Sequence, residues 1–240
     1  QWIRTICLHS KRNYVQSQDM KDNIDAFLGK TFSVNNKIIY NGWNSSIFSP
    51  DYSQRKSEFT ILFPGRLVKQ KDPMSFLKAI EIIKDKIVDF KVIILGDGPL
   101  RKQMESFVSS KNISNFVEFK SWVDKTEMLY NYRSASLTVL PSLNEGMSIA
   151  TLEALACGQY VIATRVSNNE SLITPGTNGN FIEKKNPADI AAKILDYYNT
   201  KFKLGYLIPL DELNKYHELF EWDKIIDEYE EDLGKIVGKR

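Results

Sequence analysis

The chain has 240 residues, of which 42% are hydrophobic and 26% are charged, as is usual for a globular protein of one or two domains. Its 32 basic and 30 acidic residues leave a net charge of +2, so charge alone predicts no nucleic-acid partner. Two distant cysteines suit reduced thiols and a cytoplasmic location, and the two histidines lack the neighbours of a zinc site or a catalytic triad. No apolar run approaches the roughly 20 residues that a membrane span needs.

The first part of the chain looks unlike the rest. Residues 14–28 carry a loose apolar stripe that predicts a helix, and residues 37–40 predict a short strand. Residues 41–44 have the composition of a turn, and the polar segment 45–57 is expected to be a linker. We therefore expect residues 1–55 to be the remnant of a preceding domain followed by a hinge.

From residue 59 onward, strand patterns alternate with helix patterns. The expected strands are 59–63, 90–95, 116–119, 137–140, 160–163 and 181–182. The expected helices are 73–86, 99–110, 124–133, one beginning near 148, 187–198, 210–219 and 222–237. Asp124 with Glu127 three residues later predicts a capping box at one helix start.

This alternation predicts an α/β fold. Residues 56–205 are expected to form a Rossmann-like parallel sheet with helices on both faces, and residues 206–240 to add C-terminal helices. Ligands of such sheets bind beyond the carboxyl ends of the strands. The loops that follow the strands should therefore share one edge and face one crevice, and they are 65–66, 96–98, 121–122 and 142–145.

The stretch 141–158 carries the strongest chemical signal. Glu153 is the only charged residue between Glu145 and Arg165, in a helix that is otherwise small or apolar. A carboxylate there is costly to bury unless something donates hydrogen bonds to it, and its two oxygens suit the paired hydroxyls of a ribose. The amides of residues 146–148, at a helix start, could hold an anion. Together these features outline a nucleotide-sugar site.

Each feature also has an ordinary interpretation. A glutamate on a helix is usually solvated, and the basic loop around Arg66 and Lys71 could be solvated too, although the two cations could neutralise a diphosphate. The segment Gly96-Asp97-Gly98 lacks the third glycine of a dinucleotide loop, so an NAD site has weak support. Its glycines are expected to allow a tight turn close to a ligand.

The segment 119–123 follows an expected strand. Its backbone could contact a nucleobase, and Trp122 could stack on that base or lie in the core. We expect Trp122 to lie in the core.

Motifs in this order resemble the C-terminal, donor-binding domain of a group 1 retaining glycosyltransferase of the GT-B fold. They are Gly-Arg-Leu-(x)3-Lys at 65–71, Gly-Asp-Gly-Pro at 96–99, Pro-Ser-(x)2-Glu-Gly at 141–146 and Glu153-Ala154. Asn41-Gly42 resembles the segment that precedes that domain in the family. The resemblance covers residues 35–200 or so.

The resemblance implies transfer of a hexose or N-acetylhexosamine, with retention, from a nucleoside diphosphate sugar to a glycan or lipid-linked acceptor in surface polysaccharide biosynthesis. As catalytic residues, Arg66 and Lys71 would hold the diphosphate and Glu145 would lie against the donor sugar, while Glu153 would bind the ribose. The other donor contacts would come from Gly65, Gly96, Gly98, Trp122, Val123, Gly146, Met147, Ser148 and Ile149. No metal and no other cofactor is expected.

The family's N-terminal domain, which holds the acceptor site, is almost wholly absent from these 240 residues. Residues 1–30 resemble its last helix, and the helices after residue 206 would pack back on it. We therefore expect little or no transfer from this chain alone. Contact with a membrane surface, at the inner face of the membrane, is expected only through the absent domain.

Two other functions stay open, a non-catalytic nucleotide-sugar-binding subunit and a nucleotide-sugar epimerase. The sequence does not identify the nucleobase, the sugar, the acceptor, the linkage or the oligomeric state.

Overall fold

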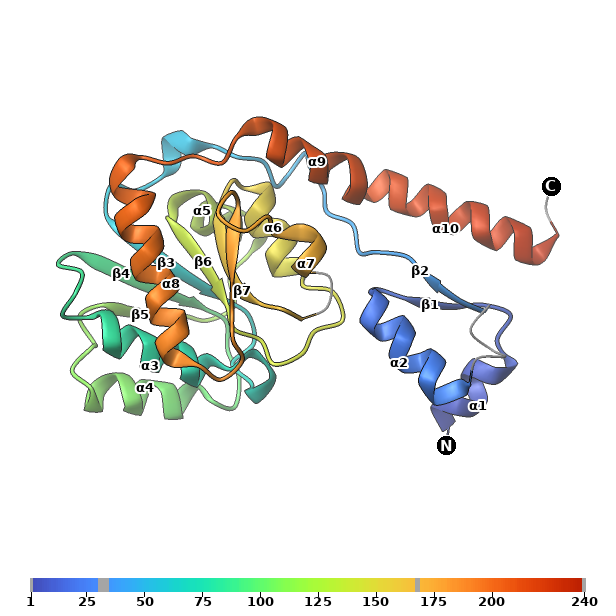
Figure 1. Cartoon of the computed structure of the whole chain (residues 1–240), viewed down its shortest axis with the longest axis horizontal. Helices are drawn as coiled ribbons and strands as arrows, with labels where there is room; N and C mark the ends of the chain where they lie inside the picture. Colours follow the sequence, from blue (N-terminus) through green and yellow to red (C-terminus); the bar gives the residue numbers. More distant parts are fainter. Residues whose placement is uncertain (1, 30–34, 167–168, 239–240) are drawn as a thin grey trace.

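The computed structural model describes residues 2–29, 35–166 and 169–238, and its main body is a six-stranded parallel sheet (Figure 1). The strand order is β5-β4-β3-β6-β7-β8, so the chain builds outward in one direction from β3 and then in the other from β6. The strands are β3 (Phe59–Pro64), β4 (Phe90–Leu95), β5 (Val117–Lys120), β6 (Leu137–Leu140), β7 (Tyr160–Thr164) and β8 (Gly179–Ile182). The order reverses between β3 and β6, which is where open sheets of this kind bind ligands.

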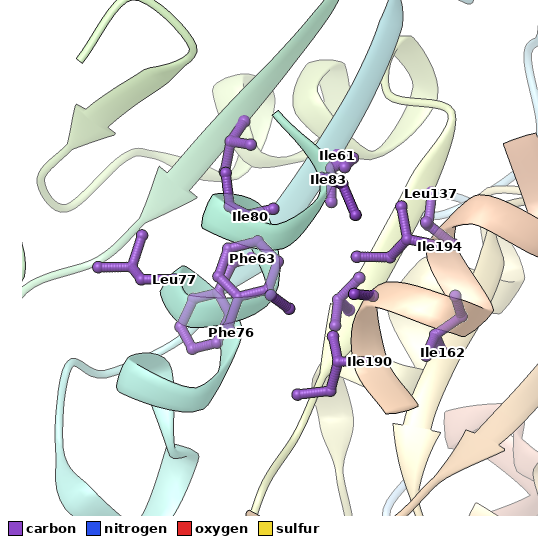
Figure 2. Packing of buried hydrophobic residues seen from close by; sticks show 14 of the residues in the cluster. Ile61, Phe63, Phe76, Leu77, Ile80, Ile83, Leu137, Ile162, Ile190 and Ile194 are labelled. Carbon is purple, nitrogen blue, oxygen red and sulfur yellow. The ribbon is translucent and has the colours of Figure 1, made fainter. Parts of the chain in front are cut away.

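Helices cover both faces of this sheet (Figure 1), as the alternating pattern predicts. On one face lie α3 (Pro73–Ile83), α4 (Arg101–Ser110) and α8 (Pro187–Thr200), and on the other lie α5 (Lys125–Ser134), α6 (Ile149–Ala156) and α7 (Asn169–Leu172). Successive strand residues point to opposite faces: Ile61 and Phe63 pack beneath α3 and α8, whereas Leu62 packs on the other side. Figure 2 shows Phe63 against Phe76 of α3, with ring centroids 5.0 Å apart.

Helix starts fall where the sequence supplies a capping side chain. The carboxylate of Asp124 accepts a hydrogen bond from the amide of Glu127 at 2.8 Å, which confirms the predicted cap of α5. The hydroxyl of Ser148 accepts from the amide of Thr151 and so begins α6. Each cap therefore fixes the point at which the loop after a strand ends and the next helix begins.

The N-terminal residues form a strand–helix–strand unit rather than the end of a single helix. The helix predicted over residues 14–28 is wrong in its first part, because β1 (Asn13–Val15) pairs in parallel with β2 (Asn36–Ile38). Ser17 caps the helix that follows, α2 (Gln18–Leu28), by accepting from the amide of Met20. A further helix, α1 (Trp2–His9), precedes β1.

The segment between this unit and the large sheet is neither a turn at 41–44 nor a free linker over 45–57. Trp43 forms a parallel bridge with Glu221, and a turn follows it at residues 45–47. The linker prediction is wrong because Phe48 is buried and a short helix, η2 (Tyr52–Gln54), packs against α5. The segment is therefore part of the main body, where apolar burial holds it.

The chain ends with α9 (Leu210–Phe220) and α10 (Trp222–Val237), which lead back toward the N-terminal unit (Figure 1). Two further 3-10 helices are η3 (Lys69–Lys71) and η4 (Phe202–Leu204). Over the described residues, no helix is both long and apolar enough to cross a membrane.

Candidate functional site

A cavity of about 410 Å³ lies at the carboxyl ends of β3, β4, β5 and β6. Each of the four loops that follow these strands contributes to its wall, so the predicted convergence at one edge of the sheet is present. Its lining residues are Gly65, Arg66, Lys71, Leu95, Gly96, Ser121, Trp122, Val123, Met128, Glu145 and Ile149. The cavity therefore sits at the reversal of strand order, with two cations and one carboxylate in its wall.

The charged wall of the cavity comes from the two loops on either side of the reversal. Lys71, the last residue of η3, places its Nζ 2.5 Å from Oε1 of Glu145, and both side chains are largely buried, at 16% and 10% exposure. Arg66 is exposed and makes no ion pair within the described part of the chain. One cation is thus paired with the carboxylate, and the other is available to an anion in the cavity.

The glycines at the strand ends let the turns approach each other. A Cβ atom added at Gly96 would lie 2.2 Å from the carbonyl oxygen of Gly65, closer than any real contact. Gly98 does not line the cavity. It lies against the loop that follows β3, where an added Cβ would meet the carbonyl oxygen of Leu67 at 2.6 Å. Gly98 therefore shapes the cavity only through the packing of its backbone.

Trp122 corrects one expectation. It lies at the cavity and not in the core, since 76% of its surface is exposed. The reason is its position after β5, an edge strand whose residues are partly buried or exposed, so the loop that follows it lies at the rim of the sheet. An exposed indole at the mouth of a cavity offers a flat face for stacking.

Glu153 lies one helical turn beyond the cavity-lining Ile149 on α6 and does not itself line the cavity. Tyr132 stands one turn beyond Met128 on α5 in the same way, and its hydroxyl donates to Oε2 of Glu153 at 3.1 Å. Burial raises the pKa of Glu153 to about 7, while the bond from Tyr132 and the charge of Lys125 oppose that rise. A carboxylate poised in this way can still accept further hydrogen bonds.

Gly146 and Met147, between Glu145 and Ile149, lie against the N-terminal part of the chain. A Cβ at Gly146 would come within 3.2 Å of side-chain atoms of Gln16 and Met20. Met147 is buried, and its sulfur accepts from the amide of Asn41 at 3.0 Å. Of the four predicted residues 146–149, only Ile149 lines the cavity.

Three lining residues were not among the predicted donor contacts, Leu95, Ser121 and Met128. Ser121 belongs to the predicted loop 121–122 and Leu95 directly precedes the predicted loop 96–98, so their place in the sequence was the available signal. Met128 lies on α5 four residues after its cap, and its direction could be found only by placing α5 against the sheet. Among the described residues, no group of three or more histidine, cysteine or acidic side chains could hold a metal ion.

Comparison with protein families gives a match over most of the main body. The family model described as glycosyl transferases group 1 matches residues 46–208. An uncharacterised glycosyltransferase of Methanocaldococcus jannaschii is 34% identical over 192 residues, covering 79% of this chain and 50% of that protein. The chain spans about half the length of the curated relatives it matches.

Solved structures share the fold. Sucrose-phosphate synthase from Thermosynechococcus elongatus superimposes with a TM-score of 0.86 at 19% identity, covering 99% of this chain and 61% of that one. The HepE protein of Anabaena, crystallised with UDP-glucose, superimposes with a TM-score of 0.83 at 17% identity, covering 94% and 64%. The likeness shows the α/β, Rossmann-like architecture of the C-terminal half of a GT-B fold.

Proposed function

The chain belongs to the glycosyl transferases of group 1, and from that membership we propose that its cavity binds a nucleoside diphosphate sugar as a glycosyl donor. The transferred group is a hexose or N-acetylhexosamine, and the acceptor is a glycan or a lipid-linked sugar of surface polysaccharide biosynthesis. The observation that carries the proposal is the convergence of two cations, a carboxylate and an exposed indole on one cavity. The UDP-glucose bound to the related fold of HepE supports the class of donor.

The charged wall would act on the diphosphate. Departure of the sugar leaves negative charge on the diphosphate, and cations held in place beforehand stabilise it. Arg66 would fork onto phosphate oxygens, and Lys71 would act as a point charge beside them. Glu145, in the same wall, would lie against the donor sugar during transfer with retention of configuration.

The opposite end of the cavity would hold the nucleoside. Trp122 would stack on the base, with the backbone of Val123 beside it. Glu153, one helical turn behind the cavity-lining Ile149, would accept hydrogen bonds from ribose hydroxyls that reach past the wall, while Tyr132 donates to its Oε2. No metal ion enters this scheme, since the two cations of the wall serve the diphosphate.

Calorimetric titration tests the donor proposal. We expect one of UDP, GDP and ADP to bind the chain at micromolar to millimolar strength, with EDTA present. At about pH 8, above the pKa of Glu153, Glu153→Ala should weaken that binding about 10- to 100-fold, because hydrogen bonds to a charged acceptor are worth about 1.5–3 kcal/mol. The matched control is Glu170→Ala, since Glu170 is exposed, pairs with Arg165 and does not line the cavity.

Two results would contradict the proposal. One is the absence of binding by all three diphosphates and by their sugar conjugates. The other is equal binding by the wild type and Glu153→Ala, which would refute the contact between Glu153 and the ribose and so the proposed orientation of the nucleotide in the cavity.

A further inference from the structure

The two loops beside the reversal of strand order are tied together by more than the Lys71–Glu145 pair. The amide of Leu143 donates to the carbonyl oxygen of Gln70 at 2.7 Å, and the side-chain amide of Gln70 donates to the carbonyl oxygen of Asn144 at 3.0 Å. These bonds hold the residues just before Lys71 and Glu145 at fixed separation. The loops that carry the ion pair are therefore tied to each other by hydrogen bonds of their own, which keeps Lys71 and Glu145 within reach of each other.

We propose that Glu145 competes with the donor's diphosphate for Lys71 and so makes the site prefer the nucleotide sugar over the free nucleoside diphosphate. The inference rests on the proposed function. A diphosphate at Lys71 would bring a second negative charge next to the carboxylate, in a wall where both side chains are largely buried. Like charges there repel more strongly than in water, because the local dielectric constant is lower.

Release of Glu145 from Lys71 leaves its carboxylate in need of donors. The hydroxyls of the donor sugar can supply them, since each carboxylate oxygen accepts more than one hydrogen bond. A free nucleoside diphosphate has no sugar hydroxyls next to its terminal phosphate. Its complex therefore keeps either a repulsive contact or an unsatisfied carboxylate, both of which weaken binding.

Arg66 does not remove this conflict. It makes no ion pair within the described residues and is exposed at the same cavity, so the diphosphate gains its charge without displacing a partner. Lys71 alone is shared between ligand and protein. Glu145 thus acts on specificity, and after transfer the same competition favours release of the diphosphate product.

The test compares wild type and Glu145→Gln in titrations with the matched pairs UDP and UDP-glucose, GDP and GDP-mannose, and ADP and ADP-glucose. For the pair that binds, we expect Glu145→Gln to bind the free diphosphate about 10-fold more tightly. Its affinity for the nucleotide sugar should stay level or fall. The dissociation constant of the free diphosphate, divided by that of the nucleotide sugar, then falls. Misfolding of the variant cannot explain a gain in affinity.

Glu170→Gln is the control, because it makes the same change in an exposed pair away from the cavity and should leave both constants unaltered. If the wild type binds but Glu145→Gln binds the free diphosphate no more tightly, the inference is wrong and the proposed function stands. If the wild type binds no member of any pair, the proposed function is wrong and the inference falls with it.

Discussion

At the scale of single residues, Glu153 has the most unusual environment near the site. It lies on an otherwise apolar helix, and Tyr132 is its hydrogen-bond donor from across the α5–α6 contact. Burial raises its pKa from 4.5 to about 7. The folded protein therefore keeps a proton that the unfolded chain has already released, over the interval between those two values.

Stability should accordingly fall as the pH rises through that interval. The loss is on the order of 3 kcal/mol between about pH 4.5 and about pH 7, and it levels off above that. Glu153→Gln carries no ionisable group, so it should match the wild type near the acidic limit and exceed its unfolding free energy by that amount at about pH 8. Urea unfolding of both proteins at several pH values measures the difference.

Glu170→Gln is the control, because it keeps Glu153 and changes an exposed side chain, so its unfolding free energy should follow that of the wild type across this pH range. A difference between the wild type and Glu153→Gln that is constant across this range would refute the assigned burial cost.

At the scale of elements, the turns that end β3 and β4 are built around backbone contact. The amide of Gly65 donates to the carbonyl oxygen of Leu95, and Gly96 adopts a φ of +136° directly against Gly65. The wall of the cavity is thus formed at this point by two backbones in contact, and no Cβ atom stands between them.

Gly96→Ala should therefore destabilise the protein by more than about 3 kcal/mol, since it combines an unfavourable φ with a backbone clash. Gly205→Ala is the matched control, because Gly205 also has a positive φ, of +66°, but among the described residues no atom lies within 4 Å of an added Cβ. It should cost about 1–2 kcal/mol, the price of the backbone conformation alone. Equal unfolding free energies for the two variants would show that the contact between the turns is loose.

At the scale of the whole molecule, the C-terminal helix α10 contacts the N-terminal unit. Asp232 is 6% exposed and receives hydrogen bonds from Arg12 and Tyr14, and Lys37 of β2 lies 3.4 Å away. Tyr14 also packs edge-on against Tyr229, with ring centroids 4.8 Å apart. These contacts fix the unit whose Gln16 and Met20 lie next to Gly146.

Asp232→Ala should loosen the N-terminal unit by about 1–3 kcal/mol, because two cations and a hydroxyl lose their shared acceptor. Amide hydrogen exchange in β1, α2 and β2 reports that local stability. Asp227→Ala, an exposed change on the same helix, should leave exchange unaltered. Unchanged exchange in Asp232→Ala would mean that apolar packing alone holds the unit.

The sequence predicts the large sheet well because its strands are apolar runs bounded by glycine, proline or capping residues. β4, β6 and α10 begin and end at the predicted residues. Residues 13–15 defeat the same approach, since a three-residue strand becomes stable only through its partner at 36–38. Trp122 shows the matching limit for burial, because an indole that can fill a core stays exposed when its strand lies at an edge.

By itself, the sequence determined the α/β class and the sheet edge at which the cavity lies, because periodicity and strand-end loops are local features. The family followed from the resemblance of its motifs. Only the tertiary structure decided which side chains meet at that edge. The pairing of Lys71 with Glu145, the ties through Gln70 and the bond from Tyr132 to Glu153 join residues that are distant in the chain. Such contacts arise from how helices and turns pack on the sheet, and no spacing along the chain encodes them.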